Sequence, residues 1–169
     1  MGFANQKRGL RLADPGFEYL SEGVYGVIFV NRTCGRIRKI YRFKKDKAHV
    51  CKVFRAETDA YCLAMANESI VSLIPRFFRI CSEQVVYDKC ERNISEEYFP
   101  DLAFEAEYIA CRFQKIGEID QTEAWRIRNL FHAASIRHTA DMSVCLDGCG
   151  QVARCIDFAV EEHELSHND

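Results

Sequence analysis

Charged residues among apolar neighbours are the part of this sequence best suited to chemistry. Lys52 lies in the apolar run His49–Phe54, and Asp157 lies between Ile156 and Phe158. A charge in such surroundings is costly unless an opposite charge, a hydrogen-bond donor or a cation satisfies it. Glu57, five residues after Lys52, is the candidate partner of the lysine. A surface ion pair is the alternative interpretation of these two residues, whereas Asp157 indicates a metal ligand.

A second candidate is the glycine-containing segment Leu20–Ile28, in which Gly23 and Gly26 stand three residues apart. Two glycines at this spacing let a strand turn sharply and bring its backbone amides close to phosphate oxygens. An ordinary hairpin turn gives the same pattern. The segment predicts either a phosphate-covering loop or a simple β-hairpin.

Taken in order along the chain, these segments resemble the protein kinase superfamily. The pattern is a glycine loop, a strand lysine, a helix glutamate, a histidine-containing loop and an aspartate–phenylalanine motif. The last two correspond to Ser135–Asp141 and to Asp157-Phe158-Ala159, and the resemblance covers roughly residues 17 to 160. It implies an α+β, minimal kinase-like fold, with an antiparallel N-lobe sheet, one helix and a strongly truncated C-lobe.

The resemblance also implies a role for each site residue and a requirement for ATP and Mg²⁺. Lys52 would position the phosphates, Glu57 would hold Lys52, Asp157 would ligate Mg²⁺, and Asp141 would orient the acceptor hydroxyl. The nucleotide would also contact two further regions, the loop and the connector between lobes: Ser21, Gly23, Gly26, Phe113 and Gln114–Glu118.

The sequence departs from the family pattern at several positions. Ser21 replaces the first loop glycine, and Ala140 stands where the aspartate normally falls, so that the acid is Asp141. No asparagine follows as a second metal ligand, and Ser143 or Asp147 would have to serve. Only about ten residues follow the aspartate–phenylalanine motif, so the activation segment and most of a helical C-lobe are absent from this sequence.

Periodicity and turn residues predict where the elements lie. We expect a polar leader over residues 1–16, an N-lobe over about 17–113, a remnant C-lobe over about 118–160 and a charged tail over 161–169. The expected elements are strands at 17–20, 27–30, 36–43, around Lys52, at 76–81, 84–87 and 102–113, helices at about 56–66 and from 120, a surface loop at 88–101 and a hairpin turn at 146–152.

Composition limits the classes of function. The 169 residues are 48% hydrophobic and 28% charged, with a net charge of −2, which gives no global reason to expect nucleic-acid binding. No segment has the apolar length of a signal peptide or a membrane span. One cationic cluster, Arg36–Lys47, would be a solvated face or a contact for an acidic partner.

Nine cysteines, an odd number within mostly apolar runs, predict reduced and buried thiols and a reducing compartment. A zinc site at Cys145, Cys149 and Cys155 with the C-terminal histidines lacks paired cysteine spacing. A cysteine–histidine nucleophile is a further alternative, although chance pairings are plentiful in this composition.

The sequence therefore predicts ATP-dependent phosphoryl transfer to a serine or threonine hydroxyl of a protein. Minimal proteins of this kind resemble effectors that pathogenic bacteria deliver into host cells, which implies a host-protein substrate. The expected location is the cytoplasm, or a host cytosol reached without a signal peptide. Two alternatives stay open: a catalytically impaired pseudokinase that binds nucleotide or protein, and a small-molecule phosphotransferase.

Overall fold

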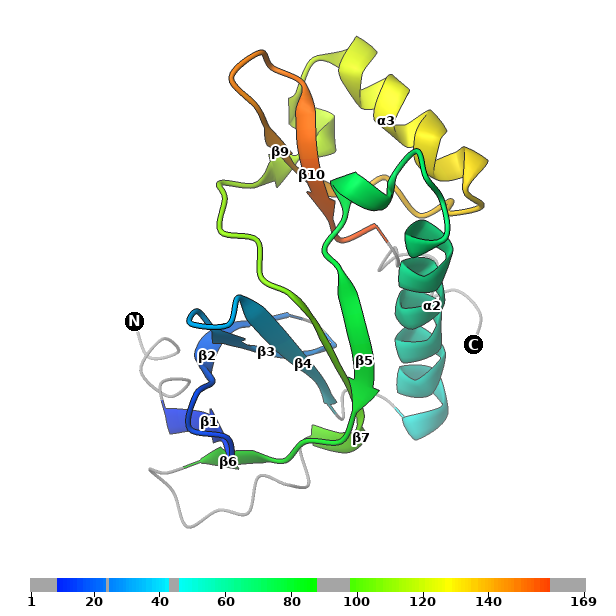
Figure 1. Cartoon of the computed structure of the whole chain (residues 1–169). Coiled ribbons are helices and arrows are strands. Elements are labelled where there is room, and N and C mark those ends of the chain that lie inside the picture. Colours follow the sequence, from blue (N-terminus) through cyan, green and yellow to red (C-terminus); the bar gives the residue numbers. More distant parts are fainter. Residues whose placement is uncertain (1–8, 24, 43–45, 88–97, 159–169) are drawn as a thin grey trace. The chain divides into compact units, whose positions relative to one another are not determined.

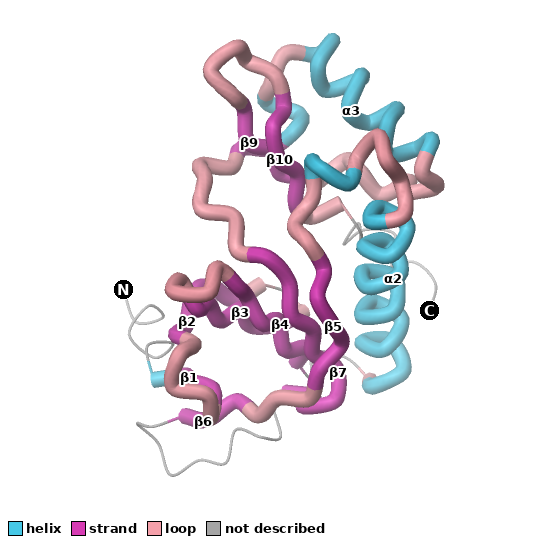
Figure 2. Tube along the Cα trace, in the orientation of Figure 1, coloured by secondary structure: helices cyan, strands magenta, loops and turns pink. Residues whose placement is uncertain are grey.

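A computed structural model describes residues 9–23, 25–42, 46–87 and 98–158. The chain divides into two compact units. The sheet unit comprises Met1–Phe54 and Phe78–Ile109, and the hairpin unit comprises Arg55–Phe77 and Ala110–Asp169. The fold is mixed α and β, with a curled antiparallel sheet and, among the described residues, two α-helices, α2 (Lys47–Met65) and α3 (Gln121–Ala133) (Figure 2).

The sheet unit is built on seven strands in the order β5-β7-β4-β3-β2-β1-β6. These are β1 (Leu10–Leu12), β2 (Glu18–Glu22), β3 (Gly26–Asn31), β4 (Arg36–Arg42), β5 (Phe77–Cys81), β6 (Val85–Tyr87) and β7 (Tyr98–Glu107). The two edge strands, β5 and β6, are consecutive in the chain and are joined by residues 82–84 alone. Six strand spacings of about 4.8 Å would separate them in a flat sheet, further than so short a link can reach. The sheet therefore has to curl (Figure 1).

The two faces of the curled sheet are both apolar at their centres. The inner face encloses a buried cluster made of Leu12, Phe17, Val27, Phe29, Ile40, Val85, Tyr98 and Ala103. On the other face the buried Tyr41 ring contacts Phe104, with centroids 6.4 Å apart, and Phe54 of α2, with centroids 5.3 Å apart. The first turns of α2 thus cover one face of the sheet.

Helix α2 begins nine residues before the predicted start of the helix at Ala56. Asp46 caps it, because its side chain accepts a hydrogen bond from the backbone N–H of His49 at 2.8 Å. Val50, Val53 and Phe54 recur at helical spacing and are buried, whereas Lys52 is exposed. The predicted strand around Lys52 is wrong, since its apolar residues follow a helical period.

In the hairpin unit a three-stranded sheet has the order β10-β9-β8, with β8 (Gln114–Lys115), β9 (Ser143–Leu146) and β10 (Val152–Ile156). Short 3₁₀ turns, η2 (Val71–Leu73) and η4 (Ile116–Glu118), complete the unit. The predicted helix from Asp120 is confirmed as α3: the Asp120 side chain accepts from the backbone N–H groups of Thr122 and Glu123, each at 3.1 Å. Its buried stripe is Ala124, Ile127 and Phe131.

Several predicted boundaries differ from the structure. Strand β1 lies inside the predicted leader, where Leu12 is buried in the sheet core. Strands β5 and β6 form where expected, and although they are consecutive in the chain they lie at opposite edges of the sheet. Strand β7 starts within the predicted surface loop at 88–101, whose first part lies outside the described residues, and it ends at Glu107, earlier than the predicted Phe113.

Candidate functional site

The glycine segment forms the turn between β2 and β3, as the sequence predicted. The backbone N–H of Gly23 donates to the carbonyl of Gly26 at 2.8 Å. Gly26 is required by the fold, because a Cβ atom there would lie 2.5 Å from the carbonyl oxygen of Ile40 on the adjacent strand. A Cβ on Gly23 would meet nothing within 4 Å, and Ser21 is exposed on β2. The open side of this hairpin is therefore at Ser21 and Gly23.

The structure places Lys52 and Glu57 on the same helix, α2, so the predicted pairing of a strand lysine with a helix glutamate is wrong for Lys52. Residues five apart on a helix do not share a face, unlike residues three or four apart. Lys52 is exposed and Glu57 is half-buried.

The strand that follows the glycine hairpin carries a different lysine, Lys39, which the sequence analysis missed. Lys39 lies on β4, opposite Ile28 of β3 and Phe104 of β7. Its ammonium nitrogen is 4.8 Å from the centroid of the Tyr41 ring. Lys39 thus shares the sheet face on which the first turns of α2 pack. The alternation of Ile37, Lys39 and Tyr41 with arginines was the signal that could have identified it.

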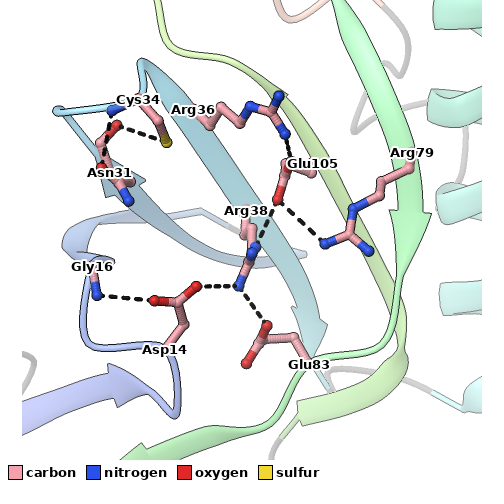
Figure 3. Close-up of polar contacts among 9 residues, drawn as sticks. All are labelled: Asp14, Gly16, Asn31, Cys34, Arg36, Arg38, Arg79, Glu83 and Glu105. Atoms are coloured by element: carbon pink, nitrogen blue, oxygen red, sulfur yellow. Dashed lines mark hydrogen bonds and ion pairs between the residues drawn. The ribbon is translucent and has the colours of Figure 1, made fainter.

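Three arginines of the cationic cluster predicted as a solvated face or an acidic-partner contact are instead paired within the sheet unit, whereas Lys47 is exposed and Lys44 and Lys45 lie outside the described residues. Glu105 of β7 is 1% exposed, and its carboxylate oxygens lie 2.5 Å from Arg36, 2.8 Å from Arg38 and 3.6 Å from Arg79 (Figure 3). Arg38 also contacts Glu83 at 2.8 Å and Asp14 at 3.3 Å. Arg42 of the same strand forms an ion pair with Glu22.

The pKa shifts within this ion cluster follow from its geometry; the cluster consists of Asp14, Arg36, Arg38, Arg79, Glu83 and Glu105. Burial opposes the charge of Glu105, but the hydrogen bonds from Arg38 and Arg36 outweigh it and lower the pKa of the carboxyl below its ordinary value. Burial likewise opposes the charge of Arg38, and its acidic neighbours raise the pKa of the guanidinium. The opposite charges are matched inside the fold, which leaves this cluster a structural role.

Asp157 directly follows β10 in the hairpin unit and has an unusual backbone. Its φ is +58°, in the left-handed region, although it is not glycine. The side chain is exposed, and its Oδ2 accepts a hydrogen bond from the hydroxyl of Ser143 on β9 at 3.3 Å. The structure therefore brings together the two residues predicted as metal ligands. Backbone strain of this kind persists where its surroundings fix it, and it is enriched at functional sites.

The other left-handed residue, Ser135 with φ +66°, has a local explanation. It follows the last turn of α3, where its N–H donates to the carbonyl of His132 and the N–H of Ile136 donates to that of Phe131, each at 3.0 Å. These two bonds make a Schellman motif, which requires a left-handed residue at this position. Asp157 follows a strand, so helix termination cannot account for its conformation.

Phe158 anchors the chain immediately after Asp157. It is 1% exposed, and its ring lies 5.1 Å from that of Tyr61 and 5.3 Å from that of Phe131, measured between centroids. Tyr61 also packs on Phe77, with centroids 5.4 Å apart. This aromatic cluster holds the backbone at Asp157 from one side while the hairpin holds it from the other.

The charges of two predicted site residues act on Tyr61. Burial raises the pKa of the Tyr61 hydroxyl well above its ordinary value, and the charges of Glu57 and then Asp157 raise it further. Glu57 lies one helical turn before Tyr61 on α2, whereas Asp157 is one hundred residues away from Glu57 in the sequence.

The loop between α3 and β9 carries the remaining candidates. Asp141 is exposed, and its backbone carbonyl accepts from the ammonium of Lys115 at 3.1 Å. Thr139 is buried, and its hydroxyl oxygen lies 3.2 Å from the Nε2 atom of His132. Phe113, the predicted adenine neighbour, is half-buried just before β8. The carboxylate of Asp141 is thus open to solvent.

Asp147, the alternative second metal ligand, has a structural role. It sits at the turn of the β9–β10 hairpin, which forms where the sequence predicted. Its Oδ1 accepts from the backbone N–H of Cys149 at 2.8 Å and from that of Gln151 at 3.0 Å. The side chain shapes the turn, so Ser143 remains the better candidate beside Asp157.

The cysteines match their prediction only in part. Eight lie in the described part of the chain and all eight are free thiols: Cys34, Cys51, Cys62, Cys81, Cys111, Cys145, Cys149 and Cys155. The prediction that most are buried is wrong, since Cys155 alone of these eight is buried. No group of three or more histidine, cysteine or acidic side chains that could hold a metal ion occurs among the residues described, so the zinc alternative has no support there.

Comparisons with protein-family models, with curated proteins and with solved structures found no match to this chain. Within the described ranges, no helix has the length and apolar character needed to cross a membrane.

Proposed function

We propose that this chain is a minimal, atypical protein kinase that transfers the terminal phosphoryl group of ATP to a serine or threonine hydroxyl of a protein. The observation that carries the proposal is the exposed, left-handed Asp157, whose carboxylate accepts a hydrogen bond from Ser143. Phosphoryl transfer depends on positioning and on charge neutralisation, and an exposed, fixed carboxylate can supply a metal ligand for both.

Asp157 and Ser143 are the residues that would hold Mg²⁺. Their oxygens are 3.3 Å apart, and Mg²⁺ is commonly bound by one or two carboxylates together with substrate phosphates and water. The donor set fits a metal that arrives with the nucleotide rather than one held by protein ligands alone. When bound, Mg²⁺ would neutralise charge on the phosphate oxygens.

The proposal assigns phosphate positioning to Lys39 in place of Lys52. Lys39 is half-buried on the strand next to the glycine hairpin, whereas Lys52 is exposed on α2. Glu57 is proposed to add negative charge beside Asp157 rather than to hold Lys52. Ser21 and Gly23, at the open side of the hairpin, would approach the phosphates, and the backbone around Phe113 would approach adenine.

Asp141 is proposed to orient the acceptor hydroxyl, because its carboxylate is exposed while its backbone carbonyl accepts from Lys115. The acceptor class rests on the resemblance of the remaining segments to protein kinases, with Lys39 proposed in the place of the strand lysine. The same resemblance supports a role as a bacterial effector that phosphorylates a host-cell protein.

The test is phosphate transfer from radiolabelled ATP with Mg²⁺ to a generic protein acceptor and to host-cell lysate. We expect Asp157→Ala and Lys39→Met each to lower transfer by at least about 100-fold, since each removes charge stabilisation at the phosphates. Lys52→Met is the matched control and should leave transfer unchanged. Loss in Lys52→Met with retention in Lys39→Met would return the role to Lys52. Full activity in Asp157→Ala would overturn the proposal.

A second candidate function is a nucleotide-binding module without transferase activity. It is favoured because the described residues contain no group of three metal-ligating side chains and because the family asparagine is missing. Thermal unfolding with and without ATP and Mg²⁺ separates the two: a ligand at 100 times its Kd adds about 2.7 kcal/mol of stability. Stabilisation without transfer selects the module. The absence of both stabilisation and transfer would contradict both functions.

A further inference from the structure

Two half-exposed cysteines of the hairpin unit lie in contact. The thiol of Cys111 forms a side-chain hydrogen bond with that of Cys145, and burial together with this neighbour raises the pKa of Cys111 to about 12. The remaining described thiols include three exposed ones, Cys34, Cys62 and Cys149, which serve as internal references for non-specific oxidation.

Strand register brings the two segments that carry these cysteines together. In the β8–β9 ladder Gln114 is opposite Val144, the residue before Cys145. Cys111 lies three residues before Gln114, just outside the ladder. A disulfide needs Cβ atoms about 3.5 to 4.5 Å apart. Residues 108–113 are in no helix or strand, so the backbone at Cys111 can adjust to that spacing.

A positive charge lies close to the pair. Arg154 of β10 is opposite Cys145 in the sheet, and its charge acts on Cys111 in the direction that favours the thiolate. Its guanidinium donates to the carbonyl of Ile74 at 3.1 Å, which fixes its position. Burial and the neighbouring Cys145 outweigh this charge, so the proximity of the two thiols, and not a lowered pKa, is what favours their pairing.

We propose that Cys111 and Cys145 form a reversible disulfide that ties residues 108–113 to β9 under oxidising conditions. With hydrogen peroxide as the oxidant, the two S–H bonds and the O–O bond break. One S–S bond forms, two electrons pass from the sulfurs to peroxide, and two water molecules leave. A dithiol reductant reverses the step by thiol–disulfide exchange. The modification depends on this pair of thiols and not on kinase activity.

The direct test is peptide mapping of the full chain after mild peroxide treatment and trypsin digestion. Cys111 falls in the tryptic peptide of residues 93–112, and Cys145 falls in that of residues 138–154 together with Cys149. We expect one dominant cross-linked species joining these peptides, and its loss after reduction. Cys149→Ser, the matched control, should keep the cross-link, whereas Cys111→Ser and Cys145→Ser should each abolish it.

A second readout is thermal unfolding of the oxidised and reduced forms. Closing a loop of this length should raise the unfolding temperature of the wild type by about 5 to 15 °C on oxidation. Cys149→Ser should show the same shift, and Cys111→Ser should show none. A cross-link that survives in Cys145→Ser, a scatter of pairings that includes Cys34 and Cys62, or no cross-link at all would overturn the proposal.

Discussion

The ion cluster of the sheet unit and the end of the β9–β10 hairpin in the hairpin unit use acidic residues in opposite ways. Glu105 is 1% exposed and faces three arginines, so its charge is neutralised by ion pairs within the sheet unit. Asp157 is exposed, has a left-handed φ, and accepts a bond from the hydroxyl of Ser143. A buried acid paired with several arginines stabilises structure, whereas an exposed acid on a fixed backbone can act on a ligand.

The largest expected effect is at Glu105. Glu105→Gln removes the negative charge from a site where Arg38 has only 12% of its side chain exposed, and the guanidinium keeps Glu83 and Asp14 as its counter-charges. Breaking a buried pair costs about 3 to 5 kcal/mol in the free energy of unfolding, and the two remaining acids place this variant at the lower end. Urea unfolding of the wild type and of Glu105→Gln measures this loss.

The control for Glu105 is Glu18→Gln, since Glu18 pairs with Arg32 at the surface with 65% of its side chain exposed. Exposed pairs contribute about 0 to 1 kcal/mol. If Glu105→Gln lowered the free energy of unfolding no more than Glu18→Gln does, the ion cluster would not be what holds the curled sheet together.

The next largest effect is at the glycine hairpin. In Gly26→Ala the new Cβ would lie 2.5 Å from the Ile40 carbonyl oxygen, so the two strands must separate. Overpacking of this kind costs about 1 to 3 kcal/mol. Gly23→Ala should change stability by less than about 0.5 kcal/mol, since its Cβ meets nothing within 4 Å. Chemical unfolding of both variants separates a glycine that the fold requires from one that is free to approach a ligand.

A third prediction concerns acid sensitivity in the hairpin unit. The hydrogen bonds from Arg126 lower the pKa of Glu123 from 4.5 to about 2. Burial acts in the opposite direction, and the hydrogen bond from the backbone N–H of Val152 lowers the pKa further. Its stabilisation is therefore complete above pH 4.5 and is lost as the pH falls from 4.5 towards 2. Glu123→Gln should be less stable at neutral pH and should show a flatter pH dependence across this window. Thermal unfolding at stepped pH measures the difference, and an unchanged slope would contradict it.

The sequence alone predicted most strands and the start of α3, because alternation and capping residues are local signals. Asp120 caps α3 at the predicted start of that helix, and the Glu123 side chain bonds Arg126 and the Val152 N–H. The segment around Lys52 was mistaken for a strand. A short run of apolar residues fits both periods, and burial of Val50, Val53 and Phe54 decided between them.

The candidate site was predictable only where chemistry could be read from single residues. Asp157 stood out as an acid among apolar neighbours, and the structure places it in contact with Ser143. The left-handed backbone at Asp157 and the packing of Phe158 on Tyr61 depend on tertiary structure. The pairing of Arg38 with its acidic partners depends on how the sheet curls, and no local pattern contains that information.

The smallest expected change in stability is at Asp157. Asn can keep both features of this position: its amide oxygen can accept from Ser143, and it tolerates the left-handed region at least as well as Asp. Asp157→Asn should therefore change the free energy of unfolding by less than about 0.5 kcal/mol. The same variant should lose Mg²⁺-dependent nucleotide stabilisation, because an amide is a far weaker ligand for a hard cation than a carboxylate. Thermal unfolding with Mg²⁺ alone, with ATP alone and with both measures the two effects on one sample. If Asp157→Asn instead destabilised the protein as much as Glu105→Gln, the two acids would play the same structural role, and the contrast between the two regions would fail.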